Sequence, residues 1–228
     1  MCSFWSGTSP RVTVNKIGLL GGTFDPVHYG HLQLAESALA ECALDKVVFI
    51  PAAEPPHKNT TAVSSFDHRL AMLELATLGM KGFECNAIEG ILPKPSYTID
   101  TLRVLQKHYR KKYHNDYQLY FMIGADAFME ILSWKSYRDV LRAVHIILSR
   151  RKGYKGERLA YLLKSLGYMA SQGCWHADDG QKDIYILART PGEQSSSTIR
   201  TMIAQGQSVE QFLPPSVILY IEKHKLYQ

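Results

Sequence analysis

Gly21-Gly22-Thr23-Phe24-Asp25-Pro26-Val27-His28-Tyr29-Gly30-His31 joins two patterned segments of the chain. An apolar run at residues 17–20 precedes this stretch and predicts a buried strand. Apolar residues at helical spacing follow it from Leu32 to Leu39, and they predict a helix whose first turn carries His31. We therefore expect the chain to pass from strand to helix through a glycine-containing turn.

The turn between these segments has the chemistry of a phosphate site. Gly21 and Gly22 have no Cβ, so a ligand can approach the backbone closely. A helix N-terminus adds unpaired N–H groups and the positive end of the helix dipole. His28 and His31 add side-chain donors. The two histidines could instead cap, pack or bind a metal, but no His-Glu-x-x-His helix or cysteine pair supports zinc. The sequence also lacks the Gly-x-Gly-x-x-Gly and P-loop patterns.

Strand-like and helix-like segments alternate along the chain. Strands are expected at residues 17–20, 47–50, 84–87, 118–123, 144–148 and 183–187. Helices are expected after a capping box at Ser64 and Asp67, after residues 96–98, and over residues 156–166. This alternation predicts an α/β fold with a single doubly wound, mostly parallel sheet. Ligands of such sheets bind beyond the carboxyl ends of the strands, where most of the motifs here fall.

Composition indicates a soluble cytoplasmic protein. The 228 residues are 46% hydrophobic and 21% charged, which suits one globular domain. No apolar run reaches the roughly 20 residues that cross a bilayer, and the N-terminus has no secretory pattern. The four cysteines are scattered, which is typical of free thiols in a reducing compartment. We interpret Cys174-Trp175-His176 and the nearby Asp178 and Asp179 as a solvated loop rather than a metal loop.

The net charge of +5 favours anionic partners only weakly. The basic run at residues 107–112 ends a helical pattern, where cations suit the helix dipole. We therefore expect a solvated helix end, and neither nucleic acid nor a membrane as a partner. The sequence leaves the oligomeric state open, a homo-oligomer included.

The eleven residues from Gly21 to His31 resemble the Gly-Gly-Thr-Phe-Asp-Pro-x-His-x-Gly-His signature of the nucleotidyltransferase superfamily. More narrowly, the chain resembles the bacterial nicotinate mononucleotide adenylyltransferases from about residue 17 to its end. The resemblance implies a Rossmann-like nucleotidyltransferase fold. From the length of the chain and the character of its first residues we expect an extension at residues 1–14 and a single domain at residues 15–228. The resemblance also implies that ATP is bound by Gly21, Gly22, Thr23, Phe24, His28 and His31.

Ser195-Ser196-Ser197-Thr198-Ile199-Arg200 resembles the second signature of this family, Ile-Ser-Ser-Thr-x-Ile-Arg. Gln194 stands at the isoleucine and Ser197 at the threonine. The serines alone could be a helix cap. The resemblance implies that Ser196, Ser197 and Arg200 bind ATP, with Arg200 at its outer phosphates.

Further motifs resemble the substrate elements of the family. Gly124 and Asp126, after a strand, are implied to bind ATP and could otherwise start a short helix. Trp134 could stack on the nicotinate ring or fill core. Tyr97 and Thr98 fall at a helix start that Ser96 or Thr98 could cap, and they are implied to lie near the pyridine carboxylate.

Two basic loop residues complete the implied nicotinate-nucleotide site. Lys58, in a Pro-Pro-His-Lys loop that would otherwise be a plain surface turn, offers a mobile charge for phosphate. Arg151 aligns with the arginine of a family Arg-Pro-Gly-Tyr turn, but Lys152 replaces the proline and Arg150 could serve instead.

The resemblance implies transfer of AMP from ATP to nicotinate mononucleotide, giving deamido-NAD and pyrophosphate in NAD biosynthesis. The substrate's own phosphate, with a second pKa of about 6, is the nucleophile and needs no general base. His28, His31 and Arg200 are the implied catalytic residues. Mg²⁺ is expected with ATP, held mainly by phosphate oxygens and not by a protein metal site. Asp25 could contact the metal or brace the turn.

The sequence leaves three alternatives to this function open. The acceptor could be nicotinamide mononucleotide or phosphopantetheine, or the protein could be a non-catalytic adenine-nucleotide sensor. The His-x-Gly-His turn also occurs in class I aminoacyl-tRNA synthetases, but the chain has no Lys-Met-Ser-Lys-Ser loop.

Overall fold

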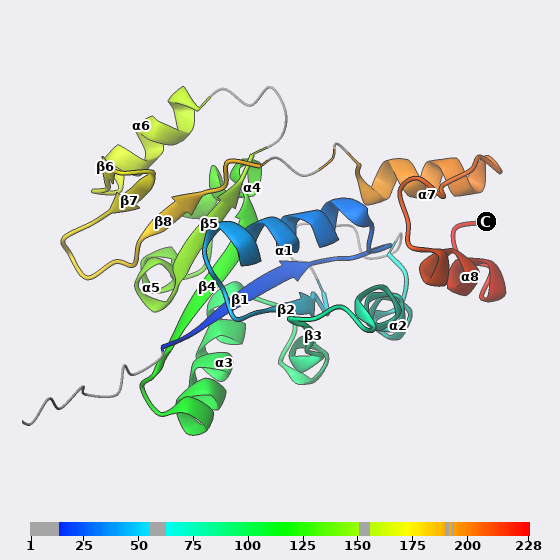
Figure 1. The fold of residues 1–228 in the computed structure, drawn as a ribbon, viewed down its shortest axis with the longest axis horizontal. Helices are drawn as coiled ribbons and strands as arrows, with labels where there is room; N and C mark the ends of the chain where they lie inside the picture. The colour runs from blue at the N-terminus through cyan, green and yellow to red at the C-terminus, as the bar shows by residue number, and fades with distance from the viewer. Residues whose placement is uncertain (1–13, 55–62, 151–155, 190–191, 193) are drawn as a thin grey trace, which may run out of the picture.

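One sheet runs through the molecule. The computed structural model describes residues 14–54, 63–150, 156–189, 192 and 194–228. Within these ranges the strands form an eight-stranded sheet in the order β3-β2-β1-β4-β5-β8-β7-β6 (Figure 1). Six of these strands run parallel to one another: β1 (Asn15–Gly22), β2 (Lys46–Pro51), β3 (Phe83–Cys85), β4 (Tyr117–Gly124), β5 (His145–Ser149) and β8 (Ile184–Ile186). The hairpin of β6 (Met169–Ser171) and β7 (Cys174–His176) continues the sheet beyond β8 in antiparallel pairing.

The strand order reverses between β1 and β4. The chain first builds outward from β1 through β2 to β3, then returns to the other side of β1 with β4 and β5. A crevice forms at such a reversal, beyond the carboxyl ends of the two strands. The expected α/β fold with a single, mostly parallel sheet is confirmed.

Helices cover both faces of the sheet. One face packs on α1 (Tyr29–Glu41), α2 (Phe66–Thr77), α7 (Ser196–Ala204) and α8 (Pro215–Lys223). The other packs on α3 (Thr98–Tyr113), α4 (Ala125–Phe128), α5 (Tyr137–Ala143) and α6 (Glu157–Ser165). Strand residues alternate between the two cores: Ile17 and Leu19 face the α3 side, whereas Leu20 faces the α1 side. The short helices η2 (Ile88–Ile91) and η3 (Ile131–Ser133) lie in connections.

Three local expectations are wrong. The strand expected at residues 84–87 ends at Cys85, because the Asn86 side chain accepts the N–H of Ile88 and starts η2. The cap of α2 is Ser65, whose hydroxyl accepts the N–H of His68, and not Ser64. The expected solvated loop at Cys174-Trp175-His176 is strand β7, in which Cys174 is buried.

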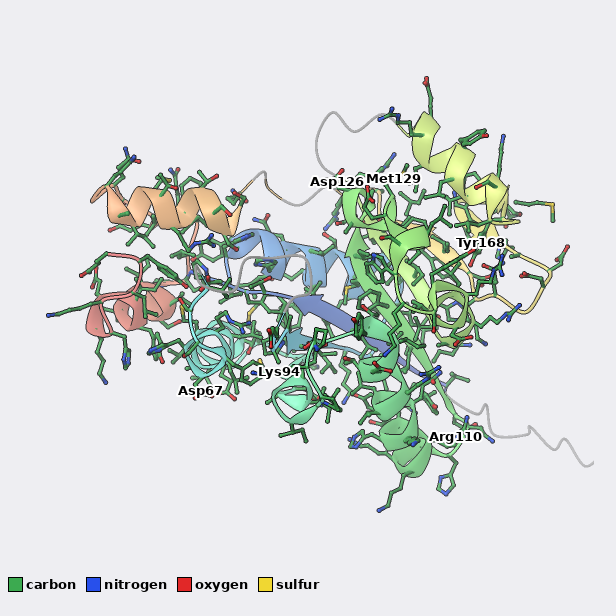
Figure 2. All side chains as sticks on the ribbon, turned by 180° about the vertical axis from the view of Figure 1, so that it is seen from behind. Asp67, Lys94, Arg110, Asp126, Met129 and Tyr168 are labelled. Carbon is green, nitrogen blue, oxygen red and sulfur yellow. The ribbon has the colours of Figure 1, made fainter. Side chains whose placement is uncertain are left out.

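The basic run lies at the end of α3, as expected. Arg110, Lys111 and Lys112 occupy the last turn of this helix. Figure 2 shows Arg110 at the bottom of the view and Asp126, which follows β4, at the top, so the basic turn lies away from the carboxyl end of β4. Among the helices of the described residues, none is long and apolar enough to cross a membrane.

Candidate active site

A cavity of about 700 Å³ opens at the carboxyl ends of β1 and β4. This size suits one or two small-molecule ligands. Twelve of the sequence-predicted site residues line it: Gly21, Gly22, Thr23, His28, His31, Tyr97, Thr98, Gly124, Asp126, Trp134, Ser196 and Ser197. Phe24 and Arg200 contact this region from behind the lining, and Lys58 and Arg151 fall outside the described residues.

His28 and His31 sit at the start of α1, where they face the cavity together. Their rings stack with centroids 3.8 Å apart. The backbone N–H of His28 donates to Nδ1 of His31 at 3.3 Å. In the neutral ring, that acceptor role of Nδ1 leaves the proton on Nε2, so His31 can donate from Nε2.

His28 is 5% exposed, and burial lowers the pKa of its imidazole to about 4. The ring is therefore neutral in the free protein at pH 7. Among the described residues, its buried Nδ1 has no hydrogen-bond partner. A phosphate group at this position would raise the pKa of His28 again, because an anion favours the charged form.

Phe24 supports this corner from below. Its ring meets His31 edge-on at 4.9 Å between centroids and is 1% exposed. A Cβ on Gly22 would lie only 2.9 Å from the Phe24 ring, so glycine is needed there. Phe24 itself has φ of 51°, a left-handed conformation that is unfavourable for a bulky side chain and marks a position under constraint.

Asp25 braces the turn. Its carboxylate is 1% exposed and accepts the Tyr227 hydroxyl at 2.5 Å and the Ser64 N–H at 3.3 Å. Nη1 of Arg200 lies 3.8 Å from the same carboxylate. Burial and the neighbouring Asp25 raise the pKa of Tyr227 far above its usual value, so its hydroxyl remains a donor. Asp25 therefore holds the C-terminal segment and the turn together.

The start of α7 meets the same corner from the other side. Ser195 caps this helix by accepting the Thr198 N–H, and Ser196 donates its hydroxyl to the Pro26 carbonyl. Arg200 donates from Nη1 to the Asp25 carbonyl at 2.7 Å. The N-termini of α1 and α7 therefore converge on one region of the cavity, which favours an anion there.

Arg69 and Glu89 organise the floor of the site, and sequence reasoning missed both. Arg69 is 1% exposed and donates to the carbonyls of Thr23, Ala52, Ala53 and Ser64. Glu89 lines the cavity and accepts the Thr101 hydroxyl and the Ala53 N–H. A single charged residue in a helical pattern reads as solvated, so no local signal marks either of them.

The other end of the cavity is formed by α3 and the segment after η3. The N-cap of α3 is Tyr97, whose side chain makes no hydrogen bond to the first turn. The alternative that Ser96 or Thr98 caps this helix is therefore wrong. The Ser96 hydroxyl instead accepts the Glu54 N–H. Trp134 is half-buried, meets Phe121 edge-on at 6.3 Å and faces the cavity.

Lys135, which the sequence reasoning also missed, adds a cation at this end. Its Nζ lies 4.4 Å from the centre of the Tyr97 ring and 2.7 Å from Asp100 Oδ2. The residue follows Trp134 directly, so the tryptophan motif could have drawn attention to it.

Gly124 and Asp126 lie between the two ends, at the start of α4. Gly124 is the N-cap of α4, and Asp126 lies in its first turn. No described atom lies within 4 Å of a Cβ built on Gly124, so the cavity is open there. Arg150 does not line the cavity, although its buried Nε has no partner among the described residues.

Comparison with known proteins agrees with this arrangement. The sequence model described as cytidylyltransferase-like matches residues 19–202. The probable nicotinate-nucleotide adenylyltransferase of Desulfotalea psychrophila is 44% identical over 214 residues, covering 94% of this chain and 100% of that protein. The one of Pelobacter propionicus is 38% identical over 218 residues, covering 93% and 98%. The structure of Plasmodium falciparum nicotinic acid mononucleotide adenylyltransferase complexed with NaAD matches with a TM-score of 0.68 at 19% identity, covering 93% of this chain and 97% of that one.

A reversal of strand order with a histidine-bearing turn above it defines a nucleotide-binding α/β protein. The chain belongs to the cytidylyltransferase-like family and, within it, to the nicotinate-nucleotide adenylyltransferases. The resemblance drawn from the sequence motifs is thereby confirmed.

Proposed function

We propose that the cavity binds ATP and nicotinate mononucleotide together and transfers AMP from ATP to the acceptor's phosphate. The products are deamido-NAD and pyrophosphate, a step of NAD biosynthesis. One observation carries the proposal: a single cavity joins an anion-binding corner, made by two helix N-termini and two histidines, to an aromatic end beside a third helix N-terminus. The corner suits a polyphosphate, and the aromatic end suits a pyridine carboxylate.

At the anion-binding corner, the chain's contribution is position and charge. Nε2–H of His31, the N–H groups of Gly22 and Thr23, and the Ser197 hydroxyl surround the place where phosphate oxygens would lie. Negative charge grows on the leaving pyrophosphate during the transfer, and these donors stabilise it. The acceptor phosphate, with a second pKa of about 6, is already largely dianionic at neutral pH. No side chain therefore has to remove a proton from the nucleophile.

Arg200 acts from behind this corner. Its guanidinium has five N–H donors, of which Nη1 holds the Asp25 carbonyl and Nη2 reaches the Ser197 hydroxyl. The residue therefore fixes the first motif against α7, and we propose that its remaining donors meet the outer phosphates. Lys58 and Arg151 stay proposed contacts of the nicotinate nucleotide.

Mg²⁺ fits this corner as an ion carried by ATP. The Asp25 carboxylate is already engaged by Tyr227, Ser64 and Arg200. Among the described residues, the group of three or more close potential metal ligands lies elsewhere in the fold. Bound to phosphate oxygens and water, the ion would neutralise polyphosphate charge.

At the aromatic end, we propose that Trp134 stacks on the pyridine ring while the first turn of α3 receives its carboxylate. The uncapped N–H groups beside Tyr97 and Thr98 favour a charged acceptor. Lys135, which is paired with Asp100, lines the same end of the cavity. A carboxamide would place an NH₂ against these donors and leave one unpaired. We therefore expect the acid to be preferred over the amide.

The test is pyrophosphate release from ATP and Mg²⁺, with nicotinate and nicotinamide mononucleotides compared side by side. We expect kcat/KM to favour the acid by at least about tenfold. Equal values would contradict the carboxylate site at α3, and turnover with phosphopantetheine alone would contradict the acceptor class. Tight ATP binding without turnover of any acceptor would instead identify a nucleotide sensor.

A further inference from the structure

A second polar cluster lies at the opposite edge of the sheet from the cavity. β5 and β8 pair with Ile146 beside Ile184, and β8 and β7 pair with Trp175 beside Ile184. One residue earlier on β5 and β8, and one residue later on the antiparallel β7, a second row crosses these strands. It consists of His145, Asp183 and His176. Because side chains alternate along a strand, this row shares one face of the sheet with Cys174.

Three donor atoms on this face lie close together. Sγ of Cys174, a ring nitrogen of His176 and a carboxylate oxygen of Asp183 all lie within 4.8 Å of one another. The shortest of these contacts joins Nδ1 of His176 to Oδ1 of Asp183 at 2.8 Å. Tetrahedral sites with metal bonds of about 2.0–2.3 Å have ligand atoms roughly 3.3–3.8 Å apart, so small side-chain rotations suffice.

His145 lies beside this group of three, next to Asp183, and supplies the independent observation. Its side chain is 12% exposed, and its Nδ1 lies 3.7 Å from Oδ2 of Asp183, beyond hydrogen-bond distance. Among the described residues, this buried nitrogen has no hydrogen-bond partner. The ring stacks on Tyr120 at 4.8 Å, which fixes its plane. A simple ion pair between His176 and Asp183 explains neither the unpaired nitrogen nor the adjacent thiol.

We propose that Cys174, His176, Asp183 and His145 bind a divalent transition-metal ion, Zn²⁺ being the one that this donor set fits best. One thiolate, two imidazoles and one carboxylate match a borderline-soft tetrahedral ion and not Mg²⁺ or Ca²⁺, which take oxygen ligands. The Tyr185 hydroxyl, 3.4 Å from Oδ2 of Asp183, orients the carboxylate from outside the ligand set.

The position of this site defines its role. His145 begins β5 and Ser149, which lines the cavity, ends it, so the two sites stand about 13 Å apart along the strand. Four protein ligands leave no open coordination position for a substrate. β7 and β8 are three-residue strands with few ladder bonds, and they lie near the outer end of the sheet (Figure 1). The ion would clip them to β5, so its function is structural.

The experiment is Co²⁺ and Zn²⁺ binding to the untagged, metal-free protein under a non-coordinating reductant. We expect about one ion per chain, with the intense visible bands of tetrahedral Co²⁺ and a thiolate-to-cobalt charge-transfer band. Zn²⁺ is expected to displace Co²⁺ and to raise Tm.

Two variants and a control make the result decisive. Cys174→Ser must lose the charge-transfer band, and His145→Ala must weaken Zn²⁺ binding by at least about tenfold. Cys85→Ser, which changes a thiol on β3 outside the cluster, must leave both unchanged. Wild-type protein that binds no Co²⁺, or binds it with weak octahedral spectra and no thiolate band, would overturn the proposal without reference to any variant.

Discussion

At the scale of single residues, the two histidines of the first motif differ in environment although they share one corner. His31 is oriented by a backbone donor to Nδ1, so a neutral ring carries its proton on Nε2. His28 is buried, and burial lowers the pKa of its imidazole to about 4. Protonation of this ring therefore lowers the stability of the folded protein. The same sequence motif thus supplies an oriented donor, His31, and a desolvated ring, His28. We expect different effects when each of them is replaced.

Replacement of His31 by alanine removes the oriented donor. We expect kcat to fall by about 100-fold or more, as when one preorganised donor to a developing negative charge is lost. The fold is expected to remain, because His31 is only partly buried. Steady-state kinetics and circular dichroism check both expectations, with His108→Ala, an exposed histidine of α3, as the matched control. A near-normal kcat in the folded variant would remove His31 from the mechanism.

The buried imidazole of His28 makes stability depend on pH. Its folded pKa of about 4 lies below the value of 6.5 for an exposed histidine, so the unfolded chain binds more protons between these values. Stability is therefore expected to be lost as pH falls from about 6.5 to 4, by up to about 3 kcal/mol from this residue. Urea unfolding at several pH values checks this slope, which should be shallower in His28→Gln. Equal slopes in the two proteins would contradict it.

At the scale of elements, strands with a clear hydrophobic pattern could be predicted from the sequence. Features that depend on contacts between residues far apart in the sequence could not. The strands β1, β2, β4 and β5 are apolar runs buried on both faces, and the sequence located each of them. The sequence also located β8, whose three residues are all apolar or aromatic. β6 and β7 are equally short but mix apolar and polar residues, so they show no hydrophobic run.

The same reasoning separates the found from the missed residues of the site. His28, His31 and Ser196 lie within short motifs that a reader can recognise. Arg69 is identified only by the four carbonyls that it meets in space. Lys135 is identified by its place above the Tyr97 ring.

The contact between the C-terminal segment and the turn between β1 and α1 joins residues that are far apart in the sequence. Tyr227 donates to the buried Asp25 carboxylate across 202 residues of sequence. Tyr227→Phe deletes that hydroxyl, and a hydrogen bond to a charged group is worth about 1.5–3 kcal/mol. We expect the free energy of unfolding to fall by this amount and KM for ATP to rise. Urea unfolding and steady-state kinetics measure both.

The control for this prediction is Tyr220→Phe. It removes another tyrosine hydroxyl of the C-terminal region, the one that contacts His68, and it leaves Asp25 untouched. We expect it to spare KM for ATP. A Tyr227→Phe protein as stable and as active as wild type would show that the contact does not brace the turn.

At the scale of the molecule, the two cores cannot separate because they share the sheet. Successive residues of β1 belong to opposite cores: Leu19 lies in the core that contains residues of α3 and α5, whereas Leu20 lies in the core that contains residues of α1 and α8. The cavity lies above the same strand, and its walls come from helices of both layers. We propose that residues 15–228 are one folding unit that ligands stabilise as a whole.

Thermal unfolding is therefore expected to show one cooperative transition for the chain, with ATP shifting all of it. A ligand at about 100 times its Kd stabilises by about 2.7 kcal/mol. For a domain of this size that moves Tm by roughly 5–10 °C. Calorimetry with Mg²⁺-ATP and no acceptor measures the shift, which should be smaller in His31→Ala. Deletion of residues 2–14 should leave the transition and the shift in place. Two transitions, of which ATP moves only one, would mean that the shared sheet does not couple the two cores.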